Sequence, residues 1–445
     1  MSRWRMVLTL ALASCGEAAH DETEGSRRCD AAATLEAPLR VGVGDRVDLA
    51  LATDGVEAWS VDTLPAGWTT LATGGDRLVL RAPWQPSAGT LSLALHCAGG
   101  SEELAIEVES VALRWTSLPT WTEGEDGPPG REYFNWWIDR AAPDRALLFG
   151  GFHYRPRPFT VGSDLWALDL PSGTWSALPA PADPPGLAGG QVAPLPEGAG
   201  VLWYGGLALE NGVPTLPFEL STLDLSSATP AFVDVPVEGA PRFGDYQPIL
   251  VHDEARRRYV ALCGAGLTGM HCDVHGYDPS SHGWSSLQTA GEGPAGRNGM
   301  AWVHDRENER VVLFGGDRGG SATGCDCDDE TWALELAEDP PRWVRLETQV
   351  APPGRRNGAW AHDEAGQRFF LWGGTADGSA TVPGLWALEL TRGAERWQEV
   401  HVPDGPTVRT SGGGLYDGVR RRILFGFGNT RAGPLVDLHA LELAP

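Results

Sequence analysis

The sequence predicts an all-β protein made of repeated sheets, and three observations lead to this fold class. Short apolar runs that end on glycine recur every 51 to 59 residues: "ALLFGG" ends at Gly151, "VLWYGG" at Gly206, "RVVLFGG" at Gly316 and "FFLWGG" at Gly374, with weaker copies in "VALCGA" (260–265) and "RILFGF" (422–427). Repeats of this length are typical of arrays of one supersecondary unit. Each run has the length and the β-branched and aromatic content of a buried strand. The composition, with 58 Gly, 34 Pro and 19 Trp, favours a loop-rich β protein.

The chain begins with the pattern of an export signal. The basic "MSRWR" is followed by the apolar "MVLTLALA" and by "LASC", which ends at Cys15. This resembles a bacterial lipoprotein signal, which implies cleavage before Cys15 and lipidation of its thiol; an ordinary signal peptide with an incidental cysteine is the alternative. We expect a signal peptide over 1–14, a lipid-anchored tether over 15–30, and a protein held at the cell envelope, at the outer membrane. No other segment is apolar enough to cross a bilayer.

Residues 31–110 follow a different pattern from the rest of the chain. Apolar and polar side chains alternate in short runs such as "RVDLALA" (46–52), "RLVLRAP" (77–83) and "ELAIEVES" (103–110), and turn clusters separate them. Strands of this length and spacing predict a small β-sandwich, which resembles bacterial immunoglobulin-like domains. No motif in this region indicates a function beyond that of a spacer.

From residue 111 onward, every well-formed repeat has the same internal order. A first strand leads into "HD" or a related pair, an arginine precedes the apolar strand that ends on glycine, and a third strand and an aromatic fourth strand follow. Aspartate can accept hydrogen bonds from a turn backbone, so a hairpin turn between the first two strands is expected; its residues are Asp139, Asp253, Asp305, Asp363 and Asp417 with Arg145, Arg258, Arg310, Arg368 and Arg422. A second set of arginines lies eight residues before four of these aspartates and indicates fasteners between neighbouring sheets: Arg131, Arg297, Arg355 and Arg409.

Four short strands, a glycine pair and a late tryptophan resemble the kelch repeat, over residues 111–445. The resemblance implies a kelch-type β-propeller, and six repeats imply six blades. In repeats three and six, Ala265 and Phe427 take the place of the second glycine. The last repeat has no fourth strand, whereas "VALRWTSLP" (111–119) offers one ahead of the first repeat, with Trp115. We expect this segment to complete the last blade, because an open ring would leave two sheet edges unpaired.

Six cysteines remain after Cys15, an even number in an exported chain, and this favours disulfides. Cys29 is expected to pair with Cys97. The later four allow three pairings, among which Cys263 with Cys272 is favoured because both lie in one hairpin. Cys325 and Cys327 then form a small ring or remain thiols. Two metal sites are alternatives without a recognised ligand spacing, and no metal is predicted: zinc at these four cysteines with His271 and His275, and calcium at Asp326, Asp328, Asp329 and Glu330.

Charge and missing motifs limit the possible functions. A net charge of −25 argues against a nucleic-acid partner, because phosphates attract positive charge. All 34 basic residues are arginine, which excludes a Schiff-base lysine and a P-loop. The motifs HExxH and GxSxG are also missing from the sequence. We predict a protein that is not an enzyme and has no cofactor, with a carbohydrate-active or oxidase-type propeller enzyme as the alternative.

The variable loops that follow the glycine pairs are the natural binding surface of such a fold, since the blades carry the structure. The sequence therefore predicts a non-catalytic envelope lipoprotein that binds a protein or a glycan through these loops. The candidate binding residues are His153, Tyr154, Arg155, Arg157, Arg318 and Arg431.

Overall fold

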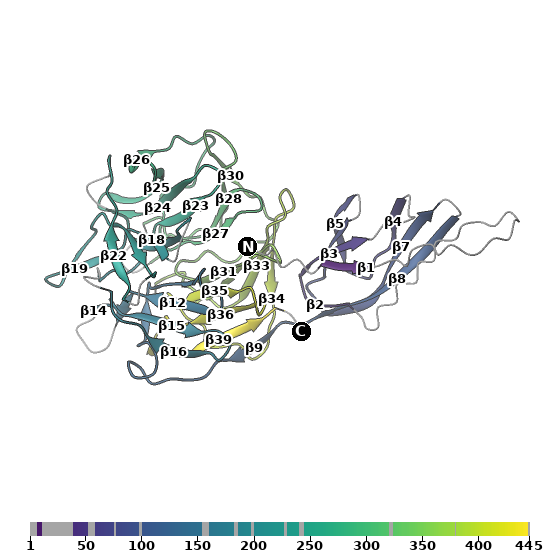
Figure 1. Ribbon diagram of the computed structural model, residues 1–445, viewed down its shortest axis with the longest axis horizontal. Coiled ribbons are helices and arrows are strands. Elements are labelled where there is room, and N and C mark those ends of the chain that lie inside the picture. Colours follow the sequence, from purple (N-terminus) through teal and green to yellow (C-terminus); the bar gives the residue numbers. More distant parts are fainter. Residues whose placement is uncertain are drawn as a thin grey trace, which may run out of the picture. The chain divides into compact units, whose positions relative to one another are not determined.

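The structure is a computed structural model, and it describes residues 7–10, 39–51, 58–74, 77–97, 100–153, 160–181, 186–196, 200–226, 229–239, 244–319, 324–378 and 380–443. Every regular element within these ranges is a β-strand, which confirms the all-β prediction (Figure 1). No helix of the described chain could span a bilayer. The chain divides into two compact units: unit 1 comprises residues 1–114 with 364–367 and 442–445, and unit 2 comprises residues 115–363 with 368–441.

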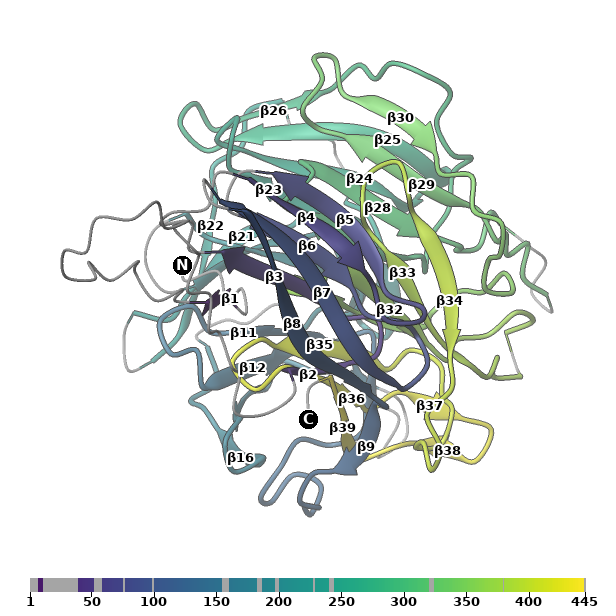
Figure 2. The same cartoon turned by 90° about the vertical axis from the view of Figure 1, so that its right-hand side faces the viewer.

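Unit 1 consists of two four-stranded sheets. One has the order β1 (Val7–Leu10), β3 (Arg46–Leu51), β6 (Arg77–Arg81), β5 (Thr69–Gly74), and the other the order β2 (Leu39–Gly42), β8 (Gly100–Val111), β7 (Ser87–Cys97), β4 (Ala58–Thr63). Figure 2 shows β7 and β8 as the two long ribbons of the second sheet. Both sheets contribute to one core, for example through Leu49 and Leu80 from the first and Leu93 and Ile106 from the second. Alternate residues of β7 are buried in it, as a half-covered strand requires.

The N-terminal predictions fall largely outside the described residues. Residues 1–6 and 11–38, which include Cys15 and Cys29, are not described. Val7–Leu10, within the predicted signal peptide, forms β1 and pairs in parallel with β3. Lipidation of Cys15 and the pairing of Cys29 with Cys97 stay predictions.

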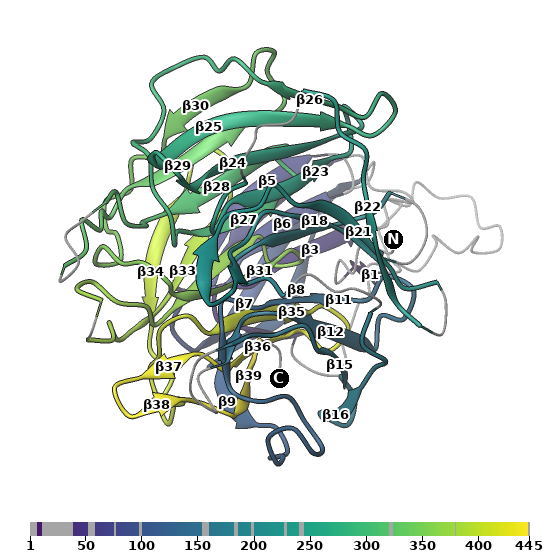
Figure 3. The same ribbon diagram turned by 90° about the vertical axis from the view of Figure 1, so that its left-hand side faces the viewer.

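Unit 2 contains six four-stranded sheets among its described residues (Figure 3). In order along the chain they are β11 (Asn135–Ile138), β12 (Arg145–Phe149), β15 (Leu165–Asp169), β16 (Thr174–Ala177); β17 (Gln191–Pro194), β18 (Gly200–Tyr204), β21 (Leu220–Asp224), β22 (Ala231–Asp234); β23 (Ile249–Asp253), β24 (Arg258–Gly266), β25 (Gly269–Asp278), β26 (Gly283–Ser286); β27 (Ala301–Asp305), β28 (Arg310–Phe314), β29 (Thr331–Glu335), β30 (Arg342–Arg345); β31 (Ala359–Asp363), β32 (Arg368–Trp372), β33 (Leu385–Glu389), β34 (Arg396–Val400); and β35 (Gly413–Asp417), β36 (Arg422–Gly426), β39 (Leu438–Glu442), β9 (Arg114–Ser117).

The sixth sheet takes its outer strand from the other end of the repeat region, as the sequence predicts. β9 lies beside β39, and the amide of Leu118 donates to the carbonyl of Leu438 at 2.9 Å. Trp115 of β9 packs against Phe425 and Trp372, with ring centroids 5.7 Å apart in both pairs.

Neighbouring sheets share their hydrophobic cores. The cluster that contains Val312 and Phe314 of β28 also contains Phe369 and Leu371 of β32, in the next sheet. β28 and β32 are buried along their whole length, because each has a sheet on both faces. This double coverage explains why the repeated runs are apolar throughout instead of alternating.

The predicted Asp–Arg hairpin turns are present in all five repeats. The Arg Nε atom donates to the Asp Oδ2 atom over 2.8 to 3.2 Å in each. In four of the turns the other carboxylate oxygen accepts a backbone amide of the turn itself. The carboxylate therefore closes the turn and anchors the start of the second strand, which is a structural role.

The glycine pairs lie in left-handed backbone conformations, and their register corrects the predicted alignment. The first glycine has φ between 66° and 74° in four repeats, and Cys263 (54°) and Phe427 (56°) occupy the same position in repeats three and six. The second position is glycine everywhere, including Gly264 and Gly428. Ala265 and Phe427 therefore do not replace the second glycine. The predicted alignment is off by one residue in both repeats. Gly264 takes the second position in repeat three, and in repeat six Gly426 stands where the other repeats have the last residue of the strand.

The second position also joins each repeat to the next. Its amide donates to a backbone carbonyl just before the following sheet: Gly151 to Leu187, Gly206 to Asp245, Gly264 to Arg297, Gly316 to Arg355 and Gly374 to Arg409, over 2.8 to 3.0 Å. The side chains of the four predicted fasteners instead stay within their own repeat, where Nη1 donates to the carbonyl oxygen of the first position: Gly150, Gly315, Gly373 and Phe427. The backbone of these arginines, and not the guanidinium, makes the link between repeats.

Candidate functional site

The loops that follow the glycine pairs lie at one end of the strands of unit 2, and we call this end the loop face. Several of these loops form hairpins of their own. They are β13 (Phe152–His153) with β14 (Thr160–Val161), which join β10 (Arg131–Glu132); β19 (Ala208–Glu210) with β20 (Val213–Thr215); the shared tip of β24 and β25; and β37 (Asn429–Thr430) with β38 (Gly433–Pro434).

Six equivalent residues, one from each repeat, surround a central opening on the loop face, and we call them the mouth ring. All six have a positive φ, between 53° and 69°: Tyr133, Gly189, Gln247, Gly299, Asn357 and Ser411. Four backbone hydrogen bonds of 2.7 Å run around the ring, from Gly189 to Tyr133, Gln247 to Gly189, Asn357 to Gly299 and Ser411 to Asn357. In these four residues the left-handed turn points the amide at a carbonyl of another repeat, so the backbone itself narrows the opening.

Side chains of the mouth ring cross the opening. Gln247 Nε2 donates to Asn357 Oδ1 at 3.0 Å, and Asn357 Nδ2 donates to Tyr133 Oη at 3.1 Å. Asn298, next to the ring, donates to Gln247 Oε1 at 3.2 Å. Burial raises the pKa of Tyr133, so its hydroxyl stays protonated and can serve this network.

Beneath this network lies a small cavity of about 60 Å³ whose lower lining includes Phe134, Met300, Trp302 and Trp360. Pockets for organic ligands typically enclose about 300–1,000 Å³. The central opening therefore has room for a few water molecules and not for a sugar ring. Sequence reasoning missed the mouth ring, although a signal was present: in four repeats the ring residue stands two positions after a fastener arginine.

Beside the mouth ring, Asp245 connects two other polar side chains. It accepts from Tyr204 Oη at 2.7 Å and lies 2.8 Å from His271 Nε2. The hydrogen bond that His271 donates to Asp245 raises the pKa of His271, and burial opposes the effect. His271 belongs to the β24–β25 tip, so this pair fastens that hairpin to the segment before β23.

The candidate binding residues are not brought together into one described cluster. Tyr154, Arg155 and Arg157 lie outside the described residues. His153 Nε2 lies 3.5 Å from Asp164, and burial together with the charge of Arg131 lowers its pKa to about 4, so His153 is neutral at pH 7. Arg318 pairs with Asp326 in the loop of repeat four, and Arg431 is exposed in the loop of repeat six.

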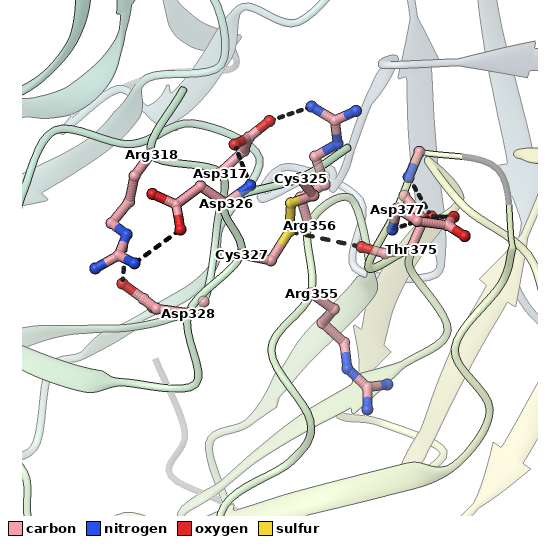
Figure 4. Close-up of a disulfide and its surroundings, with 12 residues drawn as sticks. Asp317, Arg318, Cys325, Asp326, Cys327, Asp328, Arg355, Arg356, Thr375 and Asp377 are labelled. Carbon is pink, nitrogen blue, oxygen red and sulfur yellow. Dashed lines mark hydrogen bonds and ion pairs between the residues drawn. A yellow bond between two sulfur atoms is a disulfide. The ribbon is translucent and has the colours of Figure 1, made fainter. Parts of the chain in front are cut away.

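The later cysteines form the favoured pairing, Cys263 with Cys272, and a second disulfide joins Cys325 and Cys327. The thiolates that the zinc alternative requires are thus consumed. The acidic cluster is held by arginines: Asp326 pairs with Arg318 (Figure 4), and Asp328 and Glu330 both pair with Arg297. Among the described residues, no group of three potential ligands could hold a metal ion.

One constellation on the flank has the order of hydrogen bonds of a serine hydrolase. Ser117 Oγ lies 3.2 Å from His439 Nδ1, and His439 Nε2 lies 3.1 Å from Asp437 Oδ2. Arg409, however, holds both carboxylate oxygens of Asp437, and with His439 and this arginine as partners the pKa of Asp437 falls to about 2 in spite of its burial. The negative charge that would stabilise an imidazolium is already compensated, and we assign this group a structural role.

Comparison with known proteins agrees with the repeat architecture. Residues 257–445 match the family model described as the KLHDC2/KLHL20/DRC7 Kelch-repeats domain. The chain is 30% identical over 184 residues to serine/threonine-protein phosphatase BSL2 of Arabidopsis thaliana. The aligned segment covers 40% of this chain and 17% of the relative. The chain is 25% identical over 373 residues to putative adagio-like protein 2 of Oryza sativa subsp. japonica, which covers 80% of this chain and 55% of the relative. The chain thus spans less than two thirds of both relatives.

A solved structure of YjhT has a similar fold, with a TM-score of 0.52 and 14% identity, over 71% of this chain and 95% of that chain. The match to the kelch model, the kelch-type neighbour and the repeated four-stranded sheets agree with one another. Residues 257–445 are thus similar to kelch repeats, and the repeated four-stranded sheets support a β-propeller fold.

Proposed function

We propose that this protein is a non-catalytic, exported lipoprotein whose six sheets are the blades of a closed propeller that binds a protein partner through the loop face. The proposal rests on the small size of the central opening within the mouth ring. Backbone and side chains of the mouth ring leave about 60 Å³ beneath them, too little for an organic substrate. The loop face therefore offers outer surface, and outer surface is what a protein partner contacts.

Two of the loops present large apolar side chains to solvent. Val213 on the β19–β20 hairpin is 61% exposed and Leu267 at the β24–β25 tip is 59% exposed. Burying such side chains on binding contributes roughly 1.5–3 kcal/mol each. The opposite end of the strands has a matching residue, since Val419 in the β35–β36 turn is 54% exposed.

The test is capture of a partner from envelope extracts by the full chain and by two variants. Val213→Glu/Leu267→Glu should lose the captured partner, because charge at the hairpin tips prevents their burial. Val419→Glu should retain it, because this change is of the same kind but lies at the other end of the strands. Equal capture by all three proteins would remove the loop face as the binding surface.

A glycan is the second ligand class, and a carbohydrate-active or oxidase-type enzyme is the alternative function. Treating the extract with protease should abolish capture if the partner is a protein, whereas treatment with glycosidases should abolish it if the ligand is a glycan. For the rest of the chain we propose a lipid anchor at Cys15 in the outer membrane, a Cys29–Cys97 disulfide, and an immunoglobulin-like spacer formed by unit 1. The two-sheet core of unit 1 supports the last of these.

A further inference from the structure

The two described disulfides have different surroundings. Cys263 and Cys272 join two neighbouring strands, and Cys263 is fully buried within a hydrophobic core. Cys325 and Cys327 lie in the loop between β28 and β29, on the loop face, and both are half-buried. Cys272 is half-buried as well. A thiolate can therefore reach either sulfur of the second disulfide, but only the Cys272 sulfur of the first.

The loop around Cys325 and Cys327 is held in place by contacts that do not involve sulfur (Figure 4). Asp317 accepts the amide of Asp326, the residue between the two cysteines, at 3.1 Å and the amide of Gly319 at 3.0 Å. Asp317 also pairs with Arg356, and its backbone forms a β-bridge with Cys327. The described parts of this loop, 317–319 and 324–328, are therefore held by contacts other than the disulfide, which leaves the disulfide free for a chemical role.

Reducing this disulfide should lower the stability of the fold only slightly, and one of the resulting thiols has a hydrogen-bond acceptor nearby. The sequence separation is 2 for Cys325–Cys327 and 9 for Cys263–Cys272. A shorter closed loop removes less entropy from the unfolded chain, so the smaller disulfide stabilises the fold less. Cys327 Sγ lies 3.8 Å from the carbonyl oxygen of Thr375, which can accept a hydrogen bond once Cys327 is a thiol (Figure 4).

Three carboxylates around the site each have an arginine partner. Asp326 pairs with Arg318, Asp328 with Arg297 and Asp317 with Arg356. Unpaired carboxylates would repel an incoming thiolate, and arginine partners reduce this repulsion.

We propose that Cys325–Cys327 is a redox-active disulfide that oxidises a pair of thiols on a protein bound at the loop face. A partner thiolate attacks Cys325 Sγ, a mixed disulfide forms, and Cys327 leaves as a thiolate that takes up a proton. The second partner thiolate then attacks the partner sulfur of the mixed disulfide, which releases Cys325. Two electrons pass from the partner to the protein, the partner gains a disulfide, and Cys325 and Cys327 end as thiols. A small disulfide such as oxidised glutathione restores the starting state by the reverse steps.

The reactivity can be tested without any partner. The oxidised full chain is equilibrated in glutathione buffers of increasing reducing strength, free thiols are alkylated in the folded state, and peptides are identified by mass spectrometry. Cys325 and Cys327 should become alkylated at a ratio of reduced to oxidised glutathione at least about tenfold lower than Cys263 and Cys272. Equal resistance of the two disulfides would overturn the inference.

Exchange is measured with a synthetic peptide that carries two cysteine thiols, in the presence of oxidised glutathione. The wild-type chain should accelerate formation of the peptide disulfide at least about tenfold over Cys325→Ser and Cys327→Ser. Cys325→Ser/Cys327→Ser should keep its melting temperature within about 2 °C of wild type, because the loop is held by other contacts. No acceleration by the wild type, or unfolding of the double variant, would overturn the inference.

The identity of the partner rests on the proposed function, whereas the reactivity does not. A chain that oxidises the peptide but captures no envelope protein would support the redox site and contradict the proposed function. A chain that captures a partner through the loop face but leaves the peptide reduced would support the proposed function and contradict the redox site.

Discussion

The backbone amide of Gly428, in the last repeat, donates a hydrogen bond of 3.0 Å to the carbonyl oxygen of Arg131, in the first. It is the sixth member of the series that joins each repeat to the next. Hydrophobic packing follows the same path, because one core cluster combines Leu148 and Trp175 of the first repeat with Phe427 and Leu438 of the last. The two ends of the repeat array therefore hold each other in place.

This relationship predicts that β9 is essential for the stability of unit 2. A chain that starts near residue 120 lacks β9 and the contacts of Trp115 with Phe425 and Trp372. Loss of a large aromatic contact typically costs about 3–5 kcal/mol. Thermal melts should show a lower melting temperature for this chain than for one that starts near residue 109. If both melt at the same temperature, β9 does not close the structure.

The pairing of β9 could be predicted from the sequence because it depends on counting strands. The last repeat lacks a fourth strand, and the region before the first repeat has one to spare. The hairpin turns could be predicted because their contacts are local: Asp305 and Arg310, which hold one of them, are only five residues apart in the sequence. No comparable signal indicates how the glycine register shifts in repeats three and six, where Cys263 and Phe427 adopt the left-handed conformation.

A buried ion pair predicts a large effect of one substitution. The side chains of Asp305 and Arg310 are 0% and 1% exposed and lie 2.9 Å apart. Asp305→Asn should lower the free energy of unfolding by about 3 kcal/mol, because removing one partner leaves a buried charge without full compensation. Asp326→Asn, in the exposed pair with Arg318, should change it by about 1 kcal/mol or less. Urea unfolding of both variants measures the difference, and equal effects would contradict it.

Substitution of the first glycine of a pair should destabilise the protein more than substitution of a glycine in an open turn. A Cβ atom at Gly373, where φ is 68°, would lie 2.3 Å from the carbonyl oxygen of Arg409. Gly373→Ala should therefore destabilise the protein by roughly 1–3 kcal/mol, through backbone strain and the clash. Gly393→Ala also has a positive φ but open space around it, and should cost less. A smaller effect at Gly373 than at Gly393 in chemical unfolding would show that the strand end can shift.

The mouth ring could not be predicted because its members share a backbone conformation and not a side chain. Tyr133, Gln247, Asn357 and Ser411 have no common chemistry, and two further members are glycines. Only the fold brings residues more than 200 positions apart within hydrogen-bond distance, as in the contact of Asn357 with Tyr133. The predicted binding residues were instead selected by side-chain type, and the charge of one of them, Arg318, is paired within its own loop.

Cys15 provides a test of the predicted anchor. In cells, Cys15→Ala should release the mature protein from membranes into the soluble exported fraction, because the thiol is the only site that the signal offers for a lipid. Ser14→Ala, one residue earlier, keeps a small side chain before the cysteine, so it should leave fractionation unchanged and serves as the control. Membrane association of an unlipidated Cys15→Ala protein would contradict the lipid anchor.

The pair of His271 and Asp245 predicts a dependence of stability on pH. His271 Nε2 lies 2.8 Å from Asp245 Oδ1, and its Nδ1 atom lies 3.9 Å from Asp273. The hydrogen bond with Asp245 raises the pKa of His271 in the folded state, and burial acts in the opposite direction. The unfolded chain has a histidine pKa of about 6.5.

Because the folded pKa is the higher one, this pair stabilises the fold fully below about pH 6.5 and loses its contribution as pH rises through the folded pKa. Between pH 5.5 and 8.5, the melting temperature of wild type should therefore fall relative to that of His271→Gln. His401→Gln, at an exposed histidine, should follow the wild-type curve. If wild type and His271→Gln run parallel across this range, the histidine does not gain a proton more readily on folding, and the β24–β25 tip is held by the Cys263–Cys272 disulfide and the backbone alone.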